Sequence, residues 1–148
     1  MNLTSVKKLP EELPTPSDTP KVLGQQVALD LHDCGTDRLD DLDWVRETLM
    51  EAARQAGATI VEAVFHKFSP WGISGVVVIS ESHLAIHIWP EYQYAAIDIF
   101  TCGSATQLEI ACEYLVRCFQ SAKPATRKFQ RGEGVRRGLS LRGPLMVT

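Results

Sequence analysis

Between residues 59 and 100 the chain carries four strand-length segments in close succession, and this arrangement most constrains its fold. The segments span residues 59–67, 75–79, 84–89 and 94–100. Short polar or turn-forming stretches, such as Ser69-Pro70-Trp71-Gly72, separate them. In the last segment apolar residues alternate with a second set that includes Asp98, which is typical of a strand with two different faces. These residues predict consecutive strands of a β-sheet.

Two amphipathic helices flank this block. Asp40 or Asp41 is placed to cap a helix that runs to about Gln55, and Gly57 is a natural C-terminal stop. A second helix is expected over about residues 105–121, because apolar residues recur there at helical spacing.

Further strands are expected at residues 26–32 and, as a short edge strand, at 125–130. The order of elements predicts an α+β two-layer sandwich, in which two helices lie on one face of a mainly antiparallel β-sheet. Strands as apolar as Val76-Val77-Val78-Ile79 leave the other face in need of cover. We expect a second copy of the chain to cover it, which makes the protein a dimer.

The 148 residues are enough for one domain with a two-layer core. Residues 1–22 contain four prolines among charged and small residues, which predicts a flexible N-terminal arm. Residues 23–132 are expected to form the domain. Residues 133–148 are rich in Gly and Arg and predict a loosely ordered C-terminal tail.

Composition argues against several classes of partner. The net charge of −3 gives no electrostatic reason to expect nucleic acid. No apolar stretch is long enough for a bilayer and no apolar leader is present, so we expect no membrane partner and a cytoplasmic location. The four cysteines show no CxxC spacing, which indicates reduced thiols rather than a disulfide framework.

The side chains best suited to catalysis are concentrated between Ser74 and Gly103. The Glu81-Ser82 bond stands in a polar cluster that interrupts two apolar strands. A serine hydroxyl can attack the preceding carbonyl and turn the amide into an ester, and elimination from that ester leads to a pyruvoyl group. This chemistry needs a tightly held peptide, hydrogen-bond donors for the oxyanion and a base. On composition alone, a plain polar turn between strands is the commoner interpretation.

His87 is the natural acid or base of this region, because imidazole exchanges protons near neutral pH. A hairpin around residues 80–82 would place Ser74 roughly across from it. Ser82 and His87 are nevertheless five residues apart, about 16 Å along an extended strand. Proton transfer does not reach that far. Either the strand is interrupted, or Ser74 and His87 act on Ser82 of a second subunit, which we prefer.

Cys102 closes a strand before a turn that precedes a helix, a position that suits proton donation or nucleophilic work. Asp30, His32, Asp33 and Cys34 contain metal-ligating types, but strand neighbours point to opposite faces and no matching pair occurs elsewhere. We therefore expect no metal site.

Taken together, these residues resemble the prokaryotic S-adenosylmethionine decarboxylase proenzymes, a pyruvoyl-dependent family of polyamine biosynthesis. The resemblance covers about residues 23–132 and is densest from Ser74 through Gly103. It implies self-cleavage between Glu81 and Ser82 into a β chain of residues 1–81 and an α chain of residues 82–148. Ser82 would become the pyruvoyl group, the cofactor of the mature enzyme.

The resemblance also implies roles for individual residues. Ser74 and His87 match positions that assist cleavage, His87 as the proton acceptor. Cys102 matches the proton donor to the substrate carbon after decarboxylation. Phe68 matches an aromatic residue that stacks on adenine, and Glu91 one that binds the ribose hydroxyls.

The mechanism implied by the resemblance is covalent. The amine of S-adenosylmethionine forms a Schiff base with the pyruvoyl carbonyl, carbon dioxide leaves, and hydrolysis releases the aminopropyl donor for spermidine. The family also implies a homodimer of αβ units with sites shared between subunits.

Some residues depart from the family pattern, among them Trp71, Ile88 and Gln93. One alternative is therefore a pyruvoyl-dependent arginine or ornithine decarboxylase on the same scaffold, although Phe68 and Glu91 favour a nucleoside substrate. Another alternative, from a different class, is a catalytically dead paralogue that regulates an active partner. Retention of Ser82 and Cys102 argues against it.

Overall fold

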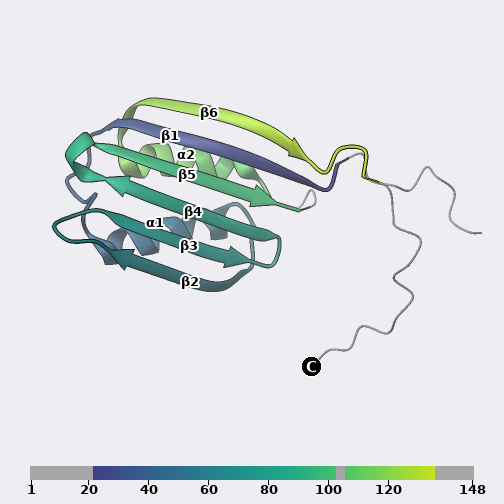
Figure 1. The fold of residues 1–148 in the computed structure, drawn as a ribbon, viewed down its shortest axis with the longest axis horizontal. Helices are drawn as coiled ribbons and strands as arrows, with labels where there is room; N and C mark the ends of the chain where they lie inside the picture. The colour runs from purple at the N-terminus through teal and green to yellow at the C-terminus, as the bar shows by residue number, and fades with distance from the viewer. Residues whose placement is uncertain (1–21, 103–105, 136–148) are drawn as a thin grey trace, which may run out of the picture.

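The computed structural model describes residues 22–102 and 106–135 (Figure 1). The elements, in chain order, are β1 (Gly24–Cys34), α1 (Leu42–Gln55), β2 (Ile60–Lys67), β3 (Ile73–Ile79), β4 (Ser82–Trp89), the short 3-10 helix η2 (Pro90–Tyr92), β5 (Tyr94–Thr101), α2 (Leu108–Phe119) and β6 (Ser121–Arg131). Most of the predicted N-terminal arm (1–22) and C-terminal tail (133–148) lies outside the described residues.

Within the described residues, six strands form one antiparallel sheet in the order β2-β3-β4-β5-β1-β6. Figure 1 shows α1 and α2 side by side behind one face of this sheet. The predicted α+β two-layer sandwich is therefore confirmed.

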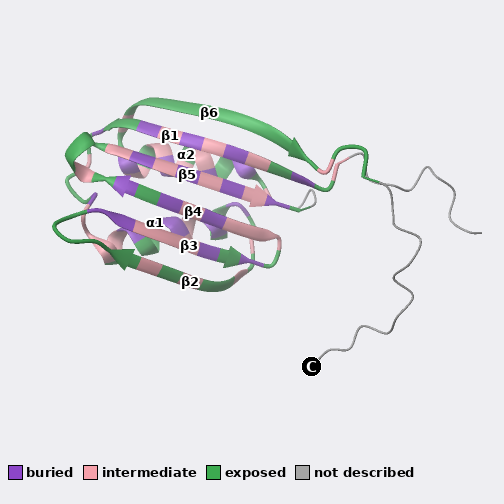
Figure 2. Cartoon of the chain, in the orientation of Figure 1, coloured by how far each residue is buried: buried purple, intermediate pink, exposed green. Residues whose placement is uncertain are grey.

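The core lies between the sheet and the two helices. Strand residues alternate between this core and the opposite face, so buried and less buried positions alternate along β1, β4 and β5 in Figure 2. The buried strand residues include Val27, Leu29, Leu31, Leu84, Ile86, Ile88, Ala95, Ile97 and Ile99. They pack against Val45, Leu49, Leu115 and Phe119 of the helices in one cluster. Each large side chain buried in this way stabilises the fold by about 1.5–3 kcal/mol.

Helix α1 begins where the sequence predicts. The Oδ1 atom of Asp41 accepts a hydrogen bond from the backbone N–H of Trp44 at 3.0 Å, so Asp41 is the N-cap. The helix ends at Gln55, and Gly57 takes a φ of 79°, the left-handed conformation that glycine tolerates best. Asp40, the other candidate cap, has different partners, described below.

The second helix and the last strand differ from their predicted bounds. Helix α2 spans Leu108–Phe119 instead of 105–121, because Gln120 adopts the left-handed conformation and the chain then turns into β6. Strand β6 begins at Ser121 and pairs with β1 along its length, so it is longer than the predicted 125–130. It tolerates Pro124 because an edge strand needs hydrogen-bond donors on one side only.

A tight hairpin joins β3 and β4. Only Ser80 and Glu81 lie between the two strands, since Ile79 already pairs with Ser82. Strand β4 thus starts at Ser82, two residues earlier than predicted, and only Ser80 and Glu81 of the polar cluster form the turn.

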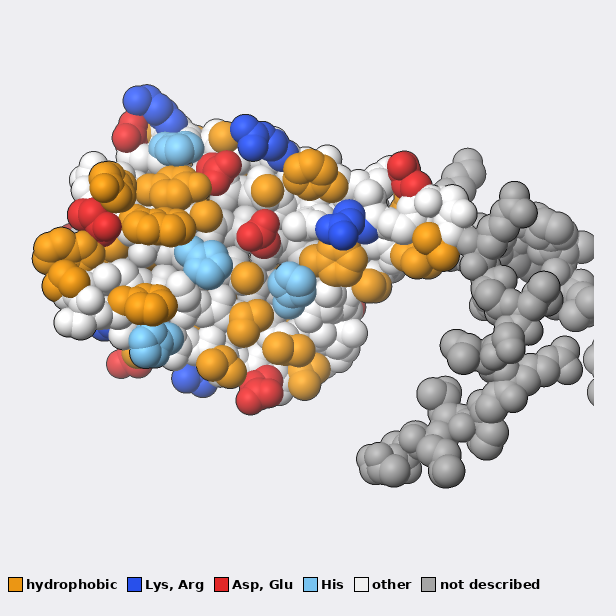
Figure 3. All heavy atoms as spheres, in the orientation of Figure 1, with side chains coloured by type: hydrophobic (Ala, Val, Ile, Leu, Met, Phe, Trp, Pro, Cys, Tyr) orange, Lys and Arg blue, Asp and Glu red, His pale blue; other side chains and the backbone are white. Residues whose placement is uncertain are grey.

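The face of the sheet opposite to the helices is rich in aromatic and aliphatic side chains. Figure 3 shows hydrophobic and histidine side chains spread across it, with acidic and basic groups between them. We call this surface the open face; it includes Val64, Val76, Val78, His83, His87, Trp89 and Phe100. Val64 is 55% exposed and Trp89 41% exposed, values far above those of the core. Among the described residues no helix combines the length and apolar character needed to cross a membrane.

Candidate functional site

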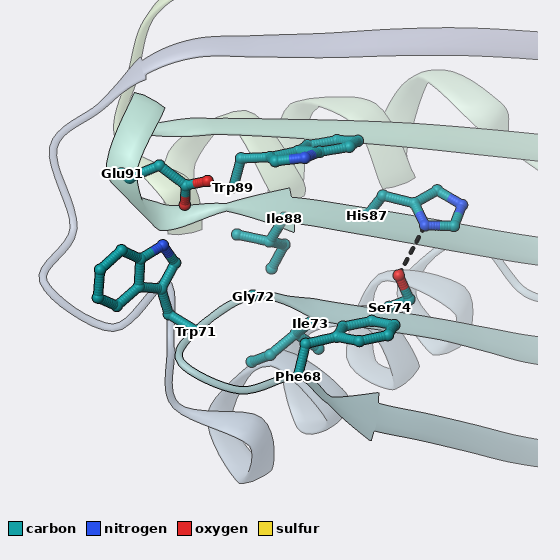
Figure 4. A pocket seen from close by; sticks show the side chains of 9 residues that line it. All are labelled: Phe68, Trp71, Gly72, Ile73, Ser74, His87, Ile88, Trp89 and Glu91. Carbon is teal, nitrogen blue, oxygen red and sulfur yellow. Dashed lines mark hydrogen bonds between the residues drawn. The ribbon is translucent and has the colours of Figure 1, made fainter.

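A cavity of about 370 Å³ lies at one end of β3 and β4. Phe68, Ser74, His87 and Glu91, four of the predicted site residues, all line it (Figure 4). Its remaining walls are Trp71, Gly72, Ile73, Ile88 and Trp89. The fold therefore gathers residues from β3, β4, the loop before β3 and η2 around a single hollow.

Ser74 and His87 are directly paired across the β3–β4 ladder. The Oγ atom of Ser74 lies 2.8 Å from Nδ1 of His87, a hydrogen-bond distance. The register expected from the sequence is thus confirmed. The contact fixes one ring nitrogen of His87, and Figure 4 shows the other end of the imidazole pointing away from Ser74.

A closed loop presents two aromatic rings to the cavity. The backbone N–H of Phe68 donates to the carbonyl oxygen of Gly72 at 2.8 Å, which closes the loop over residues 68–72. Gly72 has a φ of 107°, a conformation that disfavours any side chain. Phe68 and Trp71 are about half exposed, so each has a free ring surface available for a flat ligand.

Asp40 anchors this loop to the segment before α1. Its Oδ1 accepts a hydrogen bond from the N–H of Gly72 at 3.0 Å, and its Oδ2 lies 2.8 Å from the ammonium of Lys67. The hydrogen bond from Lys67, together with that from Gly72, lowers the pKa of the Asp40 carboxyl below its ordinary value, so the group is ionised at neutral pH. Lys67 and Gly72 flank the loop, and one carboxylate holds both ends.

No local sequence signal predicts this role of Asp40. An aspartate before an amphipathic segment is a local signal for a helix cap, and Asp40 is one of two candidates for that position. The contact with Gly72 joins positions 32 residues apart, and no local pattern reports it.

A second cluster lies at the β3–β4 hairpin. The carbonyl oxygen of Glu81 accepts a hydrogen bond from the backbone N–H of Cys102 at 2.8 Å. The side chain of Glu81 is also held, since its Oε2 accepts from the N–H of Thr59 at 3.3 Å. The carbonyl that precedes Ser82 is therefore fixed and already paired with a donor.

Ser82 is the unusual residue of this cluster. Its φ is 151°, a positive value that residues with a side chain rarely adopt and that costs of the order of 1–3 kcal/mol. Its Oγ lies 3.3 Å from Nδ1 of His83. The ring of His83 stacks on that of Phe100, with centroids 6.0 Å apart.

The arrangement suits attack on the Glu81 carbonyl. A strained residue carries the hydroxyl, a backbone N–H is already directed at the oxygen that would gain negative charge, and an imidazole nitrogen lies beside the hydroxyl. These are the requirements set out for an amide-to-ester shift at Glu81-Ser82.

The two clusters do not meet within one chain. Ser82 begins β4, whereas His87 lies five residues further along the same strand and faces the cavity. The fold brings Phe68, Ser74, His87 and Glu91 together, and separately Glu81, Ser82 and Cys102. Cys102 is exposed at the end of β5, and residues 103–105, where a turn was expected, lie outside the described residues.

The residues weighed as metal ligands have other partners. Asp30 accepts a hydrogen bond from the Tyr94 hydroxyl at 2.5 Å. Burial, together with this carboxylate, raises the pKa of Tyr94 to about 12. His32 stacks on the Tyr94 ring, and Asp33 pairs with Lys123. Cys34 is buried in the core, where desolvation raises its pKa to about 11.

Comparison with known proteins identifies close relatives. Residues 25–132 match the family model described as S-adenosylmethionine decarboxylase. An S-adenosylmethionine decarboxylase proenzyme of Pseudomonas aeruginosa is 53% identical over 113 residues, which is 76% of this chain and 71% of the relative. One from Acidithiobacillus ferrooxidans is 49% identical over 111 residues, covering 75% of this chain and 84% of the relative.

A solved structure agrees with these matches. The crystal structure of the adenosylmethionine decarboxylase from Aquifex aeolicus superimposes with a TM-score of 0.73 at 30% identity, covering 82% of this chain and 99% of that one.

Proposed function

Because this chain belongs to the S-adenosylmethionine decarboxylase family, we propose that it is a proenzyme that cleaves itself between Glu81 and Ser82 and then decarboxylates S-adenosylmethionine. The observation that carries the proposal is the geometry of this peptide: Ser82 has a φ of 151°, and the Glu81 carbonyl accepts a 2.8 Å hydrogen bond from Cys102. The product would serve as the aminopropyl donor for spermidine.

Cleavage begins with an acyl shift. The Oγ of Ser82 attacks the carbonyl carbon of Glu81, and the N–H of Cys102 stabilises the negative charge that develops on the oxygen. The C–N bond then breaks, the Ser82 nitrogen takes up the hydroxyl proton, and an ester links the two residues.

Elimination and hydrolysis complete the maturation. A base removes the Cα proton of Ser82, and the Glu81 carboxylate leaves, which gives residues 1–81 and a dehydroalanine at position 82. Water then hydrolyses the dehydroalanine, which releases its nitrogen as ammonia and leaves a ketone at the new N-terminal end of residues 82–148. This ketone is the pyruvoyl group that the family requires, and the residues around Ser82 fit its formation.

In the mature enzyme, the pyruvoyl group would supply an electron sink for the carbon that loses carbon dioxide. The other groups are those of the chain. Cys102, next to this position in the fold, would return a proton to that carbon. The half-exposed ring of Phe68 offers a face for adenine, and the Glu91 carboxylate can accept two hydrogen bonds from a ribose diol.

We further propose that the active enzyme is a homodimer of αβ units. The cavity is lined by Phe68, Ser74, His87 and Glu91 but not by Ser82 or Cys102. Each chain therefore holds one part of the site in the cavity and another part at the hairpin, and the two parts do not meet. A partner stacked on the open face would bring the cavity of one chain to the hairpin of the other. The exposed apolar side chains of that face, such as Val64 and Trp89, support the same contact.

The arginine or ornithine alternative finds no support in the comparisons, whose relatives are named for S-adenosylmethionine. A substrate panel tests the point directly. Purified protein is given S-adenosylmethionine, arginine or ornithine, and released carbon dioxide is measured. We expect release from S-adenosylmethionine, and turnover of arginine alone would refute the assignment.

Intact mass spectrometry tests self-cleavage. We expect the chain of 16.4 kDa to be replaced by two fragments that divide at Glu81-Ser82, with a ketone in place of the amino group on the second. The Ser82→Ala variant should remain a single inactive chain. An unbroken wild-type chain would favour the catalytically dead paralogue.

A further inference from the structure

His83 is the titratable side chain next to the hydroxyl of Ser82 in its own chain. Its Nδ1 lies 3.3 Å from the Oγ of Ser82, whereas the Nδ1 of His87 is engaged with Ser74. The family resemblance gives the part of proton acceptor in cleavage to His87 and assigns no role to His83.

The contact is unusual for neighbouring strand residues. Adjacent side chains of a regular strand point to opposite faces, so Ser82 and His83 would not normally meet. It coincides with the positive φ of Ser82, where the backbone departs from regular strand geometry.

The ring of His83 is held in place by its neighbours on the open face. It pairs across the sheet with Phe100 on one side and Val78 on the other. Stacking on Phe100, with an angle of 28° between the rings, restricts rotation of the imidazole. An oriented ring nitrogen beside a nucleophilic hydroxyl is the arrangement of a general base.

We propose that His83 is a catalytic residue of the first step of self-cleavage, acting as the general base for Ser82 of the same chain; this inference rests on the proposed function. In the neutral ring with the proton on Nε2, Nδ1 accepts the Oγ proton as Oγ bonds to the Glu81 carbonyl carbon. The electron pair of the carbonyl moves to its oxygen, which the N–H of Cys102 stabilises. As the C–N bond breaks, the imidazolium returns the same proton to the Ser82 nitrogen. The step is an isomerisation and needs no further reactant.

This assignment divides the two steps between two histidines. His83 serves ester formation within the chain. His87, from the partner subunit in the proposed dimer, is free to serve the later removal of the Cα proton. The distance between Ser82 and His87 within one chain, about 16 Å for a regular strand, then ceases to be a difficulty for the first step.

Two substitutions separate the base from a structural role. His83→Asn places a carbonyl oxygen near the position of Nδ1, so it can still accept a hydrogen bond from Ser82 but cannot take the proton. His83→Phe keeps an aromatic ring against Phe100 and removes the nitrogen. His32→Asn, which changes another histidine of the open face stacked on Tyr94, is the matched control.

Cleavage is followed by mass spectrometry in protein synthesised in a cell-free system, with and without hydroxylamine, which cuts esters but not amides. We expect the rate constant of cleavage to fall by about 100-fold or more in His83→Asn and His83→Phe, the usual contribution of a general base. Hydroxylamine should not restore cleavage, because no ester forms. In His87→Ala, by contrast, hydroxylamine should cut an accumulated ester. His32→Asn should cleave at the wild-type rate.

Each contrary outcome is distinct. If His83→Asn cleaves within about threefold of the wild-type rate, or if His83→Phe does so, His83 has only a packing role and the inference is overturned. An ester trapped by hydroxylamine in both variants would move His83 to the second step and overturn it as well. A wild-type chain that never cleaves would overturn the proposed function together with this inference. Thermal unfolding of both variants checks that they fold.

Discussion

Ser82 and His87 lie on the same strand, five residues apart along β4, with Ser82 at the hairpin and His87 in the cavity. A regular strand separates two such residues by about 16 Å. His87 is therefore too far from Ser82 of its own chain for proton transfer. It can act on Ser82 only if that serine belongs to another chain. The position of these two residues therefore links the chemistry to the assembly.

Co-synthesis of two inactive variants tests this link. A His87→Ala chain alone should cleave poorly. In a mixed dimer with Ser82→Ala, the His87→Ala chain meets the intact His87 of its partner, so we expect it to be cleaved. Differently tagged chains make the fragments of each distinguishable by mass.

The control replaces Ser82→Ala with the double variant Ser82→Ala/His87→Ala, in which no chain supplies the histidine. Cleavage should then be lost. Failure of the first mixture to cleave, while both chains co-purify as a dimer, would place the histidine and Ser82 in the same chain.

Removal of the Ser74 hydroxyl should slow cleavage. The 2.8 Å contact with Nδ1 orients the ring of His87, and a hydrogen bond of this kind contributes about 1 kcal/mol, or roughly a fivefold change in rate. We expect Ser74→Ala to cleave several times more slowly than the wild type and Ser74→Thr, which keeps a hydroxyl, to recover part of the loss. Equal rates in all three would show that Ser74 does not act through His87.

Substitution of Cys102 should separate cleavage from decarboxylation. Cys102→Ala keeps the backbone N–H that binds the Glu81 carbonyl and loses only the thiol. We expect normal cleavage and a large loss of carbon dioxide release from S-adenosylmethionine. Full activity in this variant would remove the thiol from the mechanism.

Cys102→Pro makes the opposite change at the same position, because proline has no N–H. Removing one donor to a developing oxyanion typically lowers a rate by about 100- to 1,000-fold. Cleavage should therefore be strongly slowed, and circular dichroism shows whether the sheet is retained. Wild-type cleavage in a folded Cys102→Pro protein would contradict the role of this hydrogen bond.

Loss of the Asp40 carboxylate should weaken substrate binding without affecting cleavage. Asp40 binds Gly72 and Lys67 at the two ends of the loop that carries Phe68 and Trp71. In Asp40→Ala we expect the KM for S-adenosylmethionine to rise severalfold, with kcat nearly unchanged. Asp40→Asn retains a hydrogen-bond acceptor for Gly72, so its KM should lie between those of the wild type and Asp40→Ala. A selective fall in kcat would argue against a positioning role.

Gly75 should not tolerate even a methyl group. A Cβ atom at this position would lie 2.1 Å from the ring of Phe65, the neighbour across the β2–β3 ladder. Overpacking of this kind costs about 1–3 kcal/mol. We expect Gly75→Ala to lower the midpoint of urea unfolding. The double variant Gly75→Ala/Phe65→Ala should be more stable than the summed effects of the two single changes predict, because the clash with the Phe65 ring is gone.

Much of the fold was predictable because its signals are local. The alternation in 94–100 indicated a two-faced strand, which is confirmed. Asp40 or Asp41, together with Gly57, indicated the limits of α1, and the structure makes Asp41 the cap. Local signals were weaker where backbone conformation breaks the pattern. Gln120 carries no obvious stop signal, yet its left-handed conformation ends α2 early and lengthens β6.

The sequence alone determined which residue types are available for chemistry, because the order around Glu81-Ser82, His87 and Cys102 can be read without coordinates. It also determined the pairing of Ser74 with His87, because a short hairpin fixes the register of its strands. Only the tertiary structure decided which groups meet across long separations in the chain. The N–H of Cys102 reaches the Glu81 carbonyl because β5 lies beside β4, and Asp40 reaches Gly72 because α1 packs against the sheet. Contacts of this kind depend on how whole elements pack, and no local sequence pattern encodes them.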